Sequence, residues 1–551
     1  MKLISNLFII YLFVIFKVSS QTIVRFKENI NCLETNGGCS WTNASNWEGG
    51  YAPDPNDIVI IDFSNNEFEG PQLISSDVDS PTFYLYQLNM TCAFGQTNGL
   101  TLALYNQDIQ FTNVVSLIQG ASIHFKQNTV VRFLDDLSVD GRLQADQNVS
   151  ISLFNLDSTY RSTFYLGWDT SLTAAGYVNL AGNFKASGST ISFGSGIVFL
   201  SGAVVFTGGN FVANGTINIE QGSTVEVEGD FSVPVGLVSL LSGSQLLIEG
   251  SVLVDRMEIE TLSTFDATAD SRPIMVFNSI ESAPGSSIYI SEYRLINAKS
   301  CDIQGAINIF GSSAIFSQGR ISDLTVTNPV SYVVLTSISL DSFSANKTYA
   351  TKDLYTLFIE GSSRLGAINA TNGIIQVNSA SLDLYNAEII ATSISIGAGT
   401  NVSLGNTYIE SNDISFSGAS ILLTQDSTLV GTVDISTSLL SIGTSNQLEV
   451  RGDLLFGPQS IVDIVVTAPN TNPSLSSINV QGNFEFTGTS FNIQSLSAVS
   501  RLQTINYAIQ ATGDISIDPT ICTFKPTDSD YKSYFSLKSI QLLNYLTYTL
   551  K

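Results

Sequence analysis

The sequence predicts an all-β protein whose fold is a right-handed parallel β-helix (β-solenoid) with an N-terminal cap. Apolar and polar residues alternate over short stretches, which is typical of β-strands because successive side chains point to opposite faces. One phrase, apolar-x-apolar-x-Gly-(Asn/Asp/Ser)-apolar, recurs, and its first four glycines, Gly182, Gly209, Gly229 and Gly250, are spaced by 27, 20 and 21 residues. Short strands, corners and this spacing describe one coil of a parallel β-helix, and parallel connections are expected to be right-handed.

The first phrase occurs six times, at Val178–Phe184, Val205–Phe211, Val225–Phe231, Leu246–Val252, Leu448–Leu454 and Ile478–Phe484. Its glycine, followed by Asn or Asp, is expected to supply the left-handed backbone of a sharp corner. A second phrase, Gly-Ser/Ala/Thr-x-apolar, begins at Gly188, Gly222, Gly243, Gly285 and Gly418, with close variants at Gly120 and Gly311. A string of β-sandwich domains would also contain short strands and glycine turns. However, no immunoglobulin-type Cys-Trp-Cys spacing and no Pro-rich linker occurs in the sequence.

Four segments are expected: a signal peptide at residues 1–20, an N-terminal cap region at 21–90, coils at 91–493, and C-terminal coils with a cap at 494–551. In the first segment, Lys2 precedes the ten apolar residues Leu7–Phe16, and small residues stand before Gln21. Ten apolar residues are too few to span a bilayer comfortably. We therefore expect a secreted, extracellular protein, including the cell surface, with no membrane span after signal cleavage. An uncleaved anchor is the alternative.

The five cysteines fit an oxidising compartment only in part. Cys32 and Cys39 flank a turn-forming Asn-Gly-Gly and are the candidate disulfide. Because the count is odd, at least one thiol is free or intermolecular, and the pairing of the five stays open. Cys301 is expected to be a small core residue, since a reactive thiolate needs a basic neighbour and only Lys299 stands close in sequence.

Candidate N-glycosylation sites follow the Asn-x-Ser/Thr rule, and their use in a eukaryotic secretory pathway is left open. They are Asn43, Asn89, Asn148, Asn214, Asn346, Asn369 and Asn401.

Composition excludes several classes of function. The chain carries 48 acidic and 23 basic residues, a formal net charge of −25, and one histidine. Nucleic-acid binding is not expected, because a reader of phosphate backbones needs a basic stripe. No Gly-rich phosphate loop and no C-x-x-C, H-E-x-x-H or G-x-S-x-G motif is present. We therefore expect no cofactor and assign no metal ligand.

Two features near the N-terminus have a structural and a functional interpretation. Trp41 and Trp47 could stack on sugar rings. Tryptophans in such a position more often form the core of a cap that covers the first coil. The oxygen-bearing side chains of Asp54, Asn56, Asp57 and Asp62 could hold Ca²⁺, but match no EF-hand and suit turns.

Three further features could have a catalytic or recognition role. Asp135 and Asp136 could act as the paired carboxylates of a glycosidase, yet no supporting His or Arg-x-Lys motif accompanies them. His124 lies in an alternating strand and is expected to be an ordinary strand residue. The Arg451–Asp453 tripeptide, RGD, is an integrin-recognition sequence in other proteins, but here it occupies a corner of the repeat.

Both ends of the chain resemble known extracellular β-helices. The stretch Leu448–Ile493 is similar to the C-terminal coils of autotransporter- and adhesin-type right-handed parallel β-helix proteins, of the pectin-lyase-like β-solenoid type. The stretch Trp41–Ile60, with its W…NW…G…P…D-apolar order, resembles the opening of such proteins. We expect no translocator domain after the repeats. The resemblance implies the architecture, while these families include adhesins, matrix proteins and enzymes.

The leading functional hypothesis is a secreted, non-catalytic β-solenoid that acts as an extracellular structural or adhesive protein. Matrix or cell-surface glycans and proteins are the expected partners, with Ca²⁺ as a further alternative. The competing hypotheses are a β-helix carbohydrate-active enzyme, either a polysaccharide lyase or a hydrolase, and a glycan-binding module using Trp41 and Trp47. Three or four carboxylates on successive coils of one exposed face, beside Arg or Lys, would favour the enzyme.

Overall fold

The structure is a computed structural model. It describes residues 21–32, 38–64, 72–76, 79–92, 99–194, 196–207, 209–270, 273–327, 332–346, 355–466, 477–496, 505–525, 533–540 and 543–550. The predicted signal peptide lies outside these residues. In the described part the chain is nearly all β and forms a parallel β-solenoid, which confirms the predicted fold class. The chain divides into two compact units, residues 1–266 and 267–551, each described by itself.

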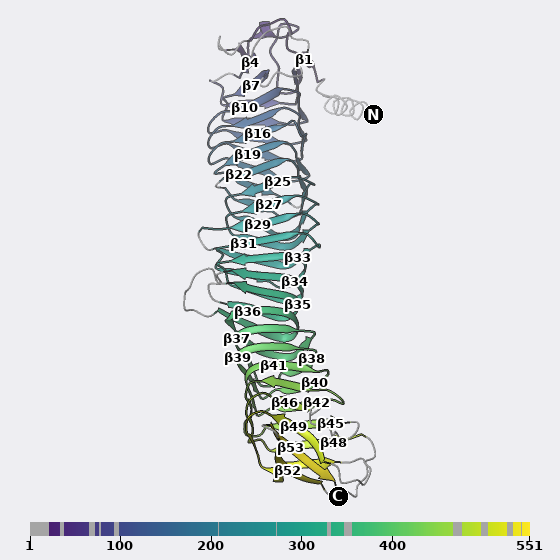
Figure 1. Cartoon of the computed structure of the whole chain (residues 1–551). Helices are drawn as coiled ribbons and strands as arrows, with labels where there is room; N and C mark the ends of the chain where they lie inside the picture. Colours follow the sequence, from purple (N-terminus) through teal and green to yellow (C-terminus); the bar gives the residue numbers. More distant parts are fainter. Residues whose placement is uncertain are drawn as a thin grey trace, which may run out of the picture. The chain divides into compact units, whose positions relative to one another are not determined.

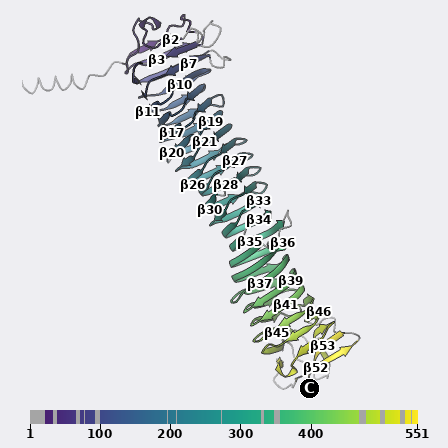
Figure 2. The ribbon, with the colours of Figure 1, turned by 90° about the vertical axis from the view of Figure 1, so that its left-hand side faces the viewer.

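In the first unit, parallel strands stack one coil above another on three faces (Figures 1 and 2). The first face contains β1 (Ile23–Arg25), β3 (Ile58–Phe63), β6 (Gln87–Cys92), β9 (Val115–Ile118), β12 (Leu137–Val139), β15 (Leu156–Ser158), β18 (Val178–Leu180), β21 (Ile197–Leu200), β24 (Thr216–Ile219) and the second parts of β26 (Phe231–Leu240) and β28 (Val252–Ile259). The second face contains β2 (Cys39–Ser40), β4 (Gln72–Ser75), β7 (Leu100–Leu104), β10 (Ala121–Phe125), β13 (Arg142–Ala145), β16 (Thr163–Leu166), β19 (Asn183–Ser187), β22 (Ala203–Thr207), β25 (Thr224–Val227) and β27 (Gln245–Ile248). The third face contains β5 (Thr82–Leu85), β8 (Asp108–Phe111), β11 (Val130–Phe133), β14 (Ser150–Leu153), β17 (Ser171–Ala174), β20 (Thr190–Phe193), β23 (Phe211–Ala213) and the first parts of β26 and β28.

The coils keep their register because each inward side chain packs on its counterpart in the next coil. On the second face, Leu143 is opposite Phe164, and Phe164 is opposite Phe184. All three are buried, and the rings of Phe164 and Phe184 lie 5.5 Å apart between centroids. On the third face, Phe211 and Phe231 stack at 5.2 Å. A slip by one residue would turn such side chains outward, so the buried ladder fixes the alignment of successive coils.

The glycines of the first repeat phrase confirm the predicted left-handed backbone only in part: Gly182 has φ of 91°. Gly229 and Gly250 do not have left-handed backbone. They are required because the coils approach closely at this corner: a Cβ on Gly229 would lie 1.9 Å from the carbonyl oxygen of Gly209, and one on Gly250 would lie 2.2 Å from that of Gly229. The expectation of left-handed backbone at these two corners was therefore wrong, and close backbone contact replaces it.

In the second phrase every glycine lies at a left-handed corner. Gly188, Gly222 and Gly243 have φ of 58°, 71° and 77°. The serine after each of these glycines is buried. Its hydroxyl group can form a hydrogen bond to a neighbouring turn: Ser189 Oγ donates to the Gly167 carbonyl at 3.1 Å. In other coils Asn takes the left-handed position, as its short polar side chain permits.

The N-terminal residues of the first unit form part of the ladder and an aromatic cluster. β1 already pairs with β3 in parallel. Trp47 is fully buried, its ring 4.9 Å from that of Trp41, and its Nε1 donates to the Trp41 carbonyl at 2.8 Å. One three-residue 3₁₀ helix, η2 (Ala44–Asn46), precedes it. Cys32 and Cys39 form the predicted disulfide. The boundaries at residues 90 and 493 stay predictions.

The second unit contains several longer strands that pass around corners. Strand β36 (Tyr355–Tyr385), for example, pairs along different parts of its length with β35 (Tyr332–Asn346), β37 (Glu388–Ile396) and β38 (Asn401–Gly405). Strand β29 (Thr264–Thr268) contains the division between the units. The strands that follow are β30 (Ile274–Ser282), β31 (Ser287–Ser291), β32 (Leu295–Ala298), β33 (Cys301–Phe310), β34 (Ala314–Thr327), β35 (Tyr332–Asn346), β36 (Tyr355–Tyr385), β37 (Glu388–Ile396), β38 (Asn401–Gly405), β39 (Tyr408–Ser417), β40 (Ser420–Leu423), β41 (Ser427–Ser436), β42 (Leu439–Ile442), β43 (Leu448–Arg451), β44 (Leu454–Phe456), β45 (Ile461–Val466), β46 (Ile478–Val480), β47 (Phe484–Phe486), β48 (Ser490–Ser495), β49 (Ile505–Ala511), β50 (Ile515–Ile517), β51 (Cys522–Lys525), β52 (Ser533–Ile540) and β53 (Leu543–Leu550), with the 3₁₀ helix η4 (Pro519–Ile521) before β51.

At the C-terminal end, some strands pair antiparallel instead of parallel. β52 and β53 form an antiparallel hairpin, and β53 also pairs antiparallel with β49. β49 is itself the parallel neighbour of β46, so the hairpin covers a strand of the coil ladder.

Candidate functional site

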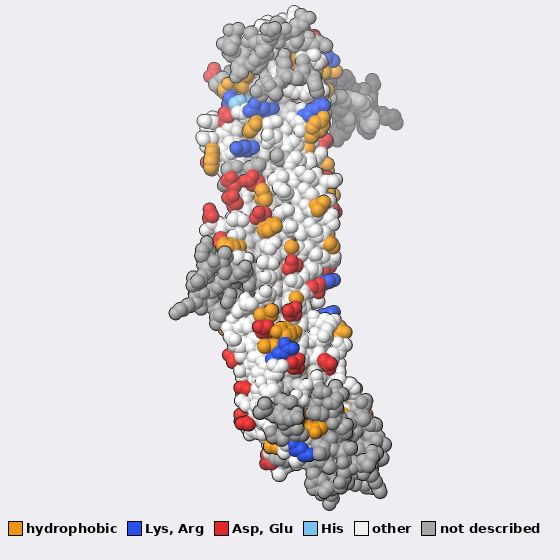
Figure 3. Space-filling model, in the orientation of Figure 1, with side chains coloured by type: hydrophobic (Ala, Val, Ile, Leu, Met, Phe, Trp, Pro, Cys, Tyr) orange, Lys and Arg blue, Asp and Glu red, His pale blue; other side chains and the backbone are white. Residues whose placement is uncertain are grey.

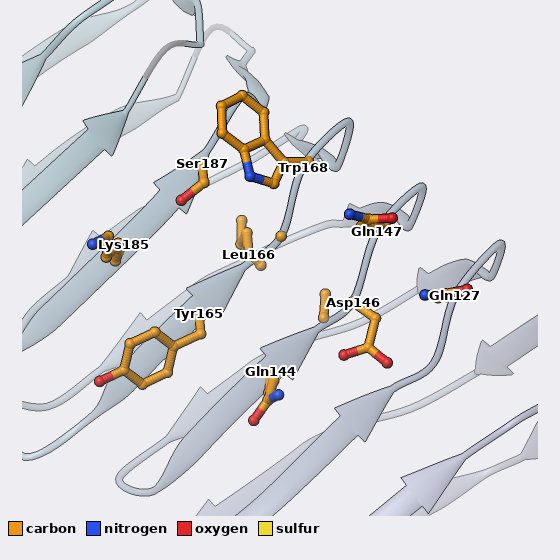
Figure 4. A pocket seen from close by; sticks show the side chains of 11 residues that line it. Gln127, Gln144, Asp146, Gln147, Tyr165, Leu166, Trp168, Lys185 and Ser187 are labelled. Atoms are coloured by element: carbon orange, nitrogen blue, oxygen red, sulfur yellow. The ribbon is translucent and has the colours of Figure 1, made fainter.

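An open pocket with a volume of about 600 Å³ lies on the second face of the first unit (Figure 4). Its walls come from three successive coils, at β13, β16 and β19, with one residue from the turn after β10. The lining residues are Gln127, Gln144, Ala145, Asp146, Gln147, Tyr165, Leu166, Gly167, Trp168, Lys185 and Ser187.

Two rows of side chains cross the coils in this pocket. The strand row consists of Gln144, Tyr165 and Lys185, which are register partners on adjacent strands. The turn row consists of Gln127, Gln147 and Trp168, which follow one another along the turns in Figure 4. The ladder produces both rows, because residues at equivalent positions of successive coils stand one above another.

The aromatic side chains of the pocket face solvent. Tyr165 is 38% exposed and Trp168 is 56% exposed. The guanidinium of Arg142 lies 4.8 Å from the centre of the Tyr165 ring and also donates to Gln144 Oε1 at 2.8 Å. A cation over an aromatic face is attractive, so Arg142 helps to hold both side chains in place at one end of the pocket.

The single histidine lies beside the pocket. His124 Nε2 is 2.7 Å from Asp146 Oδ1, and its Nδ1 is 3.1 Å from Lys126 Nζ. Burial lowers the pKa of His124, the hydrogen bond to Asp146 opposes this effect, and the charge of Lys126 adds to it. The neutral imidazole fits both contacts, with Nε2–H donating to the carboxylate and Nδ1 accepting from the ammonium group. Asp146 therefore enters the pocket as a hydrogen-bonded carboxylate.

Several candidates from the sequence lie away from this pocket. Trp41 and Trp47 are buried at 6% and 0% exposure, so they cannot offer a stacking platform. Asp135 Oδ1 accepts the backbone N–H of Asp136, and Asp136 Oδ1 accepts from Asn155 at 2.8 Å. The pair therefore stabilises the corner between β11 and β12.

Two of the acidic side chains near the N-terminus accept backbone hydrogen bonds, Asp57 at a turn and Asp62 in β3. Asp57 is buried, and its Oδ2 accepts the backbone N–H of Asp54 at 2.7 Å. Asp62 Oδ1 accepts the N–H of Ser64 at 2.9 Å. Among the described residues, no group of three or more His, Cys, Asp or Glu is placed to hold a metal ion.

The RGD tripeptide lines a second pocket, of about 690 Å³, in the second unit. Arg451 Nε is 3.0 Å from Glu449 Oε1. Asp453 Oδ1 accepts the backbone N–H of Asn483 at 2.7 Å, and a Cβ on Gly452 would lie 2.2 Å from the carbonyl oxygen of Gly431. The tripeptide is thus a corner of the coil stack, as its place in the repeat predicts.

One row of the second unit brings acids of adjacent coils together. Glu281 is the register partner of Asp302, and Asp302 is the partner of Arg320. Arg320 Nη2 is 2.5 Å from Asp341 Oδ2. Glu281, Asp302 and Asp341 are exposed.

The predicted glycosylation sites are compatible with modification where their side chains are described. Asn43, Asn148, Asn214, Asn369 and Asn401 are exposed, and Asn89 is half-buried. The side chain of Asn346 lies outside the described part. The use of these sites stays a prediction.

Three cysteines outside the Cys32–Cys39 disulfide are buried: Cys92, Cys301 and Cys522. Cys301 and Cys522 are buried, as expected for Cys301, and burial raises the pKa of each to about 12. A thiol is a poor nucleophile at neutral pH under these conditions.

Sequence patterns single out His124 but not Tyr165, Trp168 or Lys185. Their common feature is position within the coil. The strand register places His124, Gln144, Tyr165 and Lys185 at equivalent positions, 20, 21 and 20 residues apart. The first repeat phrase begins further along the chain, at Val178, so it does not align the coils that build most of the pocket.

Comparison with known proteins assigns the chain to no family. No protein-family model matches the chain, and no curated protein matches it. In the described residues, no helix combines the length and apolar character needed to cross a bilayer.

Proposed function

We propose that this chain is a secreted, non-catalytic β-solenoid that serves as an extracellular adhesive or structural protein. One observation carries the proposal: the pocket of the first unit presents two exposed aromatic rings and three amide side chains on the strand ladder, around one carboxylate that is already hydrogen-bonded. Exposed aromatic and amide groups are suited to contacts with other molecules.

The pocket is better suited to binding than to hydrolysis. Most glycosidases use two carboxyl groups that flank the scissile bond. Asp146 is the one carboxylate among the eleven lining residues, and His124 and Lys126 lie beside it. A ligand can be held there, but the second carboxylate of that mechanism is missing from the lining.

Secretion is supported by the disulfide and by exposed sequons. The Cys32–Cys39 bridge is expected to persist in an oxidising compartment. The resemblance of both chain ends to adhesin-type β-helices agrees with an adhesive role, and membership of those families is part of the proposal.

The test uses the full chain expressed in a eukaryotic secretory host. We expect mature protein in the medium, retention on surfaces coated with matrix or cell-wall polysaccharide, and no release of reducing ends or unsaturated sugars from the same polysaccharides. Product release would contradict the non-catalytic role. Retention of the protein inside the cell, or no adhesion to any coated surface, would contradict the extracellular adhesive role.

A carbohydrate-active enzyme is the second candidate, favoured by the neighbouring carboxylates of Glu281 and Asp302 beside Arg320. If polysaccharide cleavage is detected, Glu281→Gln and Asp302→Asn each should abolish it, with Asp413→Asn on another exposed row as the matched control. Cleavage that survives both changes would remove this row as the catalytic site.

A further inference from the structure

The second face of the first unit concentrates positive charge on an acidic protein. Lys185 lines the pocket, Arg142 stacks on Tyr165, and Lys126 contacts His124. The whole chain has only 23 Lys and Arg residues against 48 acidic residues. Three cations around one pocket therefore differ from the acidic charge balance of the chain as a whole. In Figure 3 the pale-blue histidine lies among blue Lys and Arg side chains, with acidic side chains gathered further along the same face.

Two carboxylates lie close to the pocket, and one of them is paired. Asp146 is hydrogen-bonded to His124, and Lys126 Nζ is 4.0 Å from its other oxygen. Asp169 follows Trp168 in sequence and has left-handed backbone at the turn. Three cations against these two carboxylates leave the surface attractive to an anion.

We propose that the pocket formed by Gln144, Tyr165, Trp168 and Lys185 binds a negatively charged pyranose oligosaccharide. This inference deepens the proposed adhesive function and rests on it. Tyr165 and Trp168 offer faces for the apolar side of sugar rings, and the three glutamine amides of the two rows can both donate to and accept from hydroxyl groups. Lys185, which lines the pocket, would pair with the acidic substituents, and Arg142 would add positive charge from its place on Tyr165.

The spacing of the coils favours a linear chain of sugars. Adjacent strands of a sheet lie about 4.8 Å apart, which is close to the length of one pyranose unit in a polysaccharide. A ligand lying across the strands would therefore meet Gln144, Tyr165 and Lys185 with successive units. The two rows of Figure 4 run in this direction, with Asp146 and Leu166 between them.

The test measures binding of defined oligosaccharides to the secreted full-length protein by calorimetry. The probes are an oligogalacturonate, a sulfated heparin-type oligosaccharide, and a neutral cello-oligosaccharide of equal length. We expect at least one anionic probe to bind at least tenfold more tightly than the neutral probe, with affinity falling as salt is raised. The two anionic probes distinguish a carboxylated ligand from a sulfated one. Equal binding of the neutral probe, or no binding of either anionic probe, would overturn the proposal.

Variants locate the site. Trp168→Ala and Tyr165→Ala should each weaken anionic binding at least fivefold, and Lys185→Gln should also reduce its salt dependence. The matched controls are Tyr289→Ala, a comparably exposed tyrosine on a strand of the second unit, and Lys299→Gln, an exposed lysine there. Controls that weaken binding as much as the pocket variants would contradict the site.

Failure of this inference can be told apart from failure of the proposed function. If the pocket variants keep adhering to polysaccharide-coated surfaces as the natural chain does, the pocket is not the adhesive site, while the adhesive function stands. If the purified chain binds the oligosaccharide through Trp168 but adheres to no coated surface, the pocket inference stands and the adhesive function fails.

Discussion

Gly229 lies so close to Gly209 in the preceding coil that a Cβ on Gly229 would come within 1.9 Å of the Gly209 carbonyl oxygen. Glycine is thus required at position 229 by the neighbouring coil. At position 222 a Cβ would meet open space, and glycine is required there by the backbone conformation, with φ of 71°. The two kinds of corner glycine should respond differently to substitution.

We expect Gly229→Ala to destabilise the first unit by about 1–3 kcal/mol, the usual cost of forcing atoms into a packed site. Gly222→Ala should cost about 1–2 kcal/mol, because an L-residue is strained in left-handed backbone. Asn tolerates that backbone, so Gly222→Asn should recover part of the loss while Gly229→Asn should not. Thermal melting of the four variants checks this. An equal response of both positions to Asn would show that the two corners do not differ.

Lowering the pH should weaken the fold through His124. Burial lowers the pKa of His124 below its ordinary 6.5, so the unfolded chain binds the proton first as the pH falls. The free energy of unfolding therefore decreases as pH falls through 6.5 towards the folded-state pKa. Since His124 is the only histidine, His124→Gln should flatten the change in urea midpoint between about pH 7.5 and 5.5. Parallel pH profiles for the two proteins would contradict the assignment.

Cys301 and Cys522 should resist alkylation in the folded protein. With thiol pKa values of about 12, few thiolates exist at about pH 8, and burial also blocks access. Iodoacetamide followed by peptide mass spectrometry should leave both unmodified, and the same treatment in guanidinium should label both. Rapid labelling without denaturant would place these thiols at the surface.

An N-glycan on Asn148 should interfere with ligand binding at the pocket. The Asn148 N–H donates to the Trp168 carbonyl at 3.0 Å, and Asn148 follows Gln147, which lines the pocket. Ser150→Ala removes the sequon without changing the left-handed Asn148, and loses only an exposed hydroxyl contact with Ser171. If mass spectrometry finds Asn148 glycosylated, this variant should bind anionic oligosaccharide more tightly. Ser403→Ala, which removes the Asn401 sequon in the second unit, should leave affinity unchanged.

The fold could be predicted because its physical signal is local and repeated. Alternation at phrases such as Val225–Phe231 marks strands, and the spacing of Gly229 and Gly250 gives the length of a coil. The reason for those glycines could not be predicted, because it depends on the distance between two coils. The same sequence pattern suits left-handed backbone and close contact.

The site could be predicted only in part for a similar reason. Trp41 and Trp47 attract attention as a nearby pair, yet both fill the core. Tyr165 and Lys185 stand 20 residues apart and become neighbours only when β16 and β19 are placed in register. The bond between His124 and Asp146 has the same origin, since the two residues lie on successive coils.

The reversed strand at the C-terminal end of the second unit has a consequence for self-association. An uncovered last coil would present unpaired N–H and C=O groups in the direction that a parallel strand from another molecule needs. On β49 that position is taken by β53, which runs the opposite way and is paired along its length with β52. The hairpin therefore opposes end-to-end polymerisation at this strand, a hazard for any sequence made of stacking repeats at high local concentration.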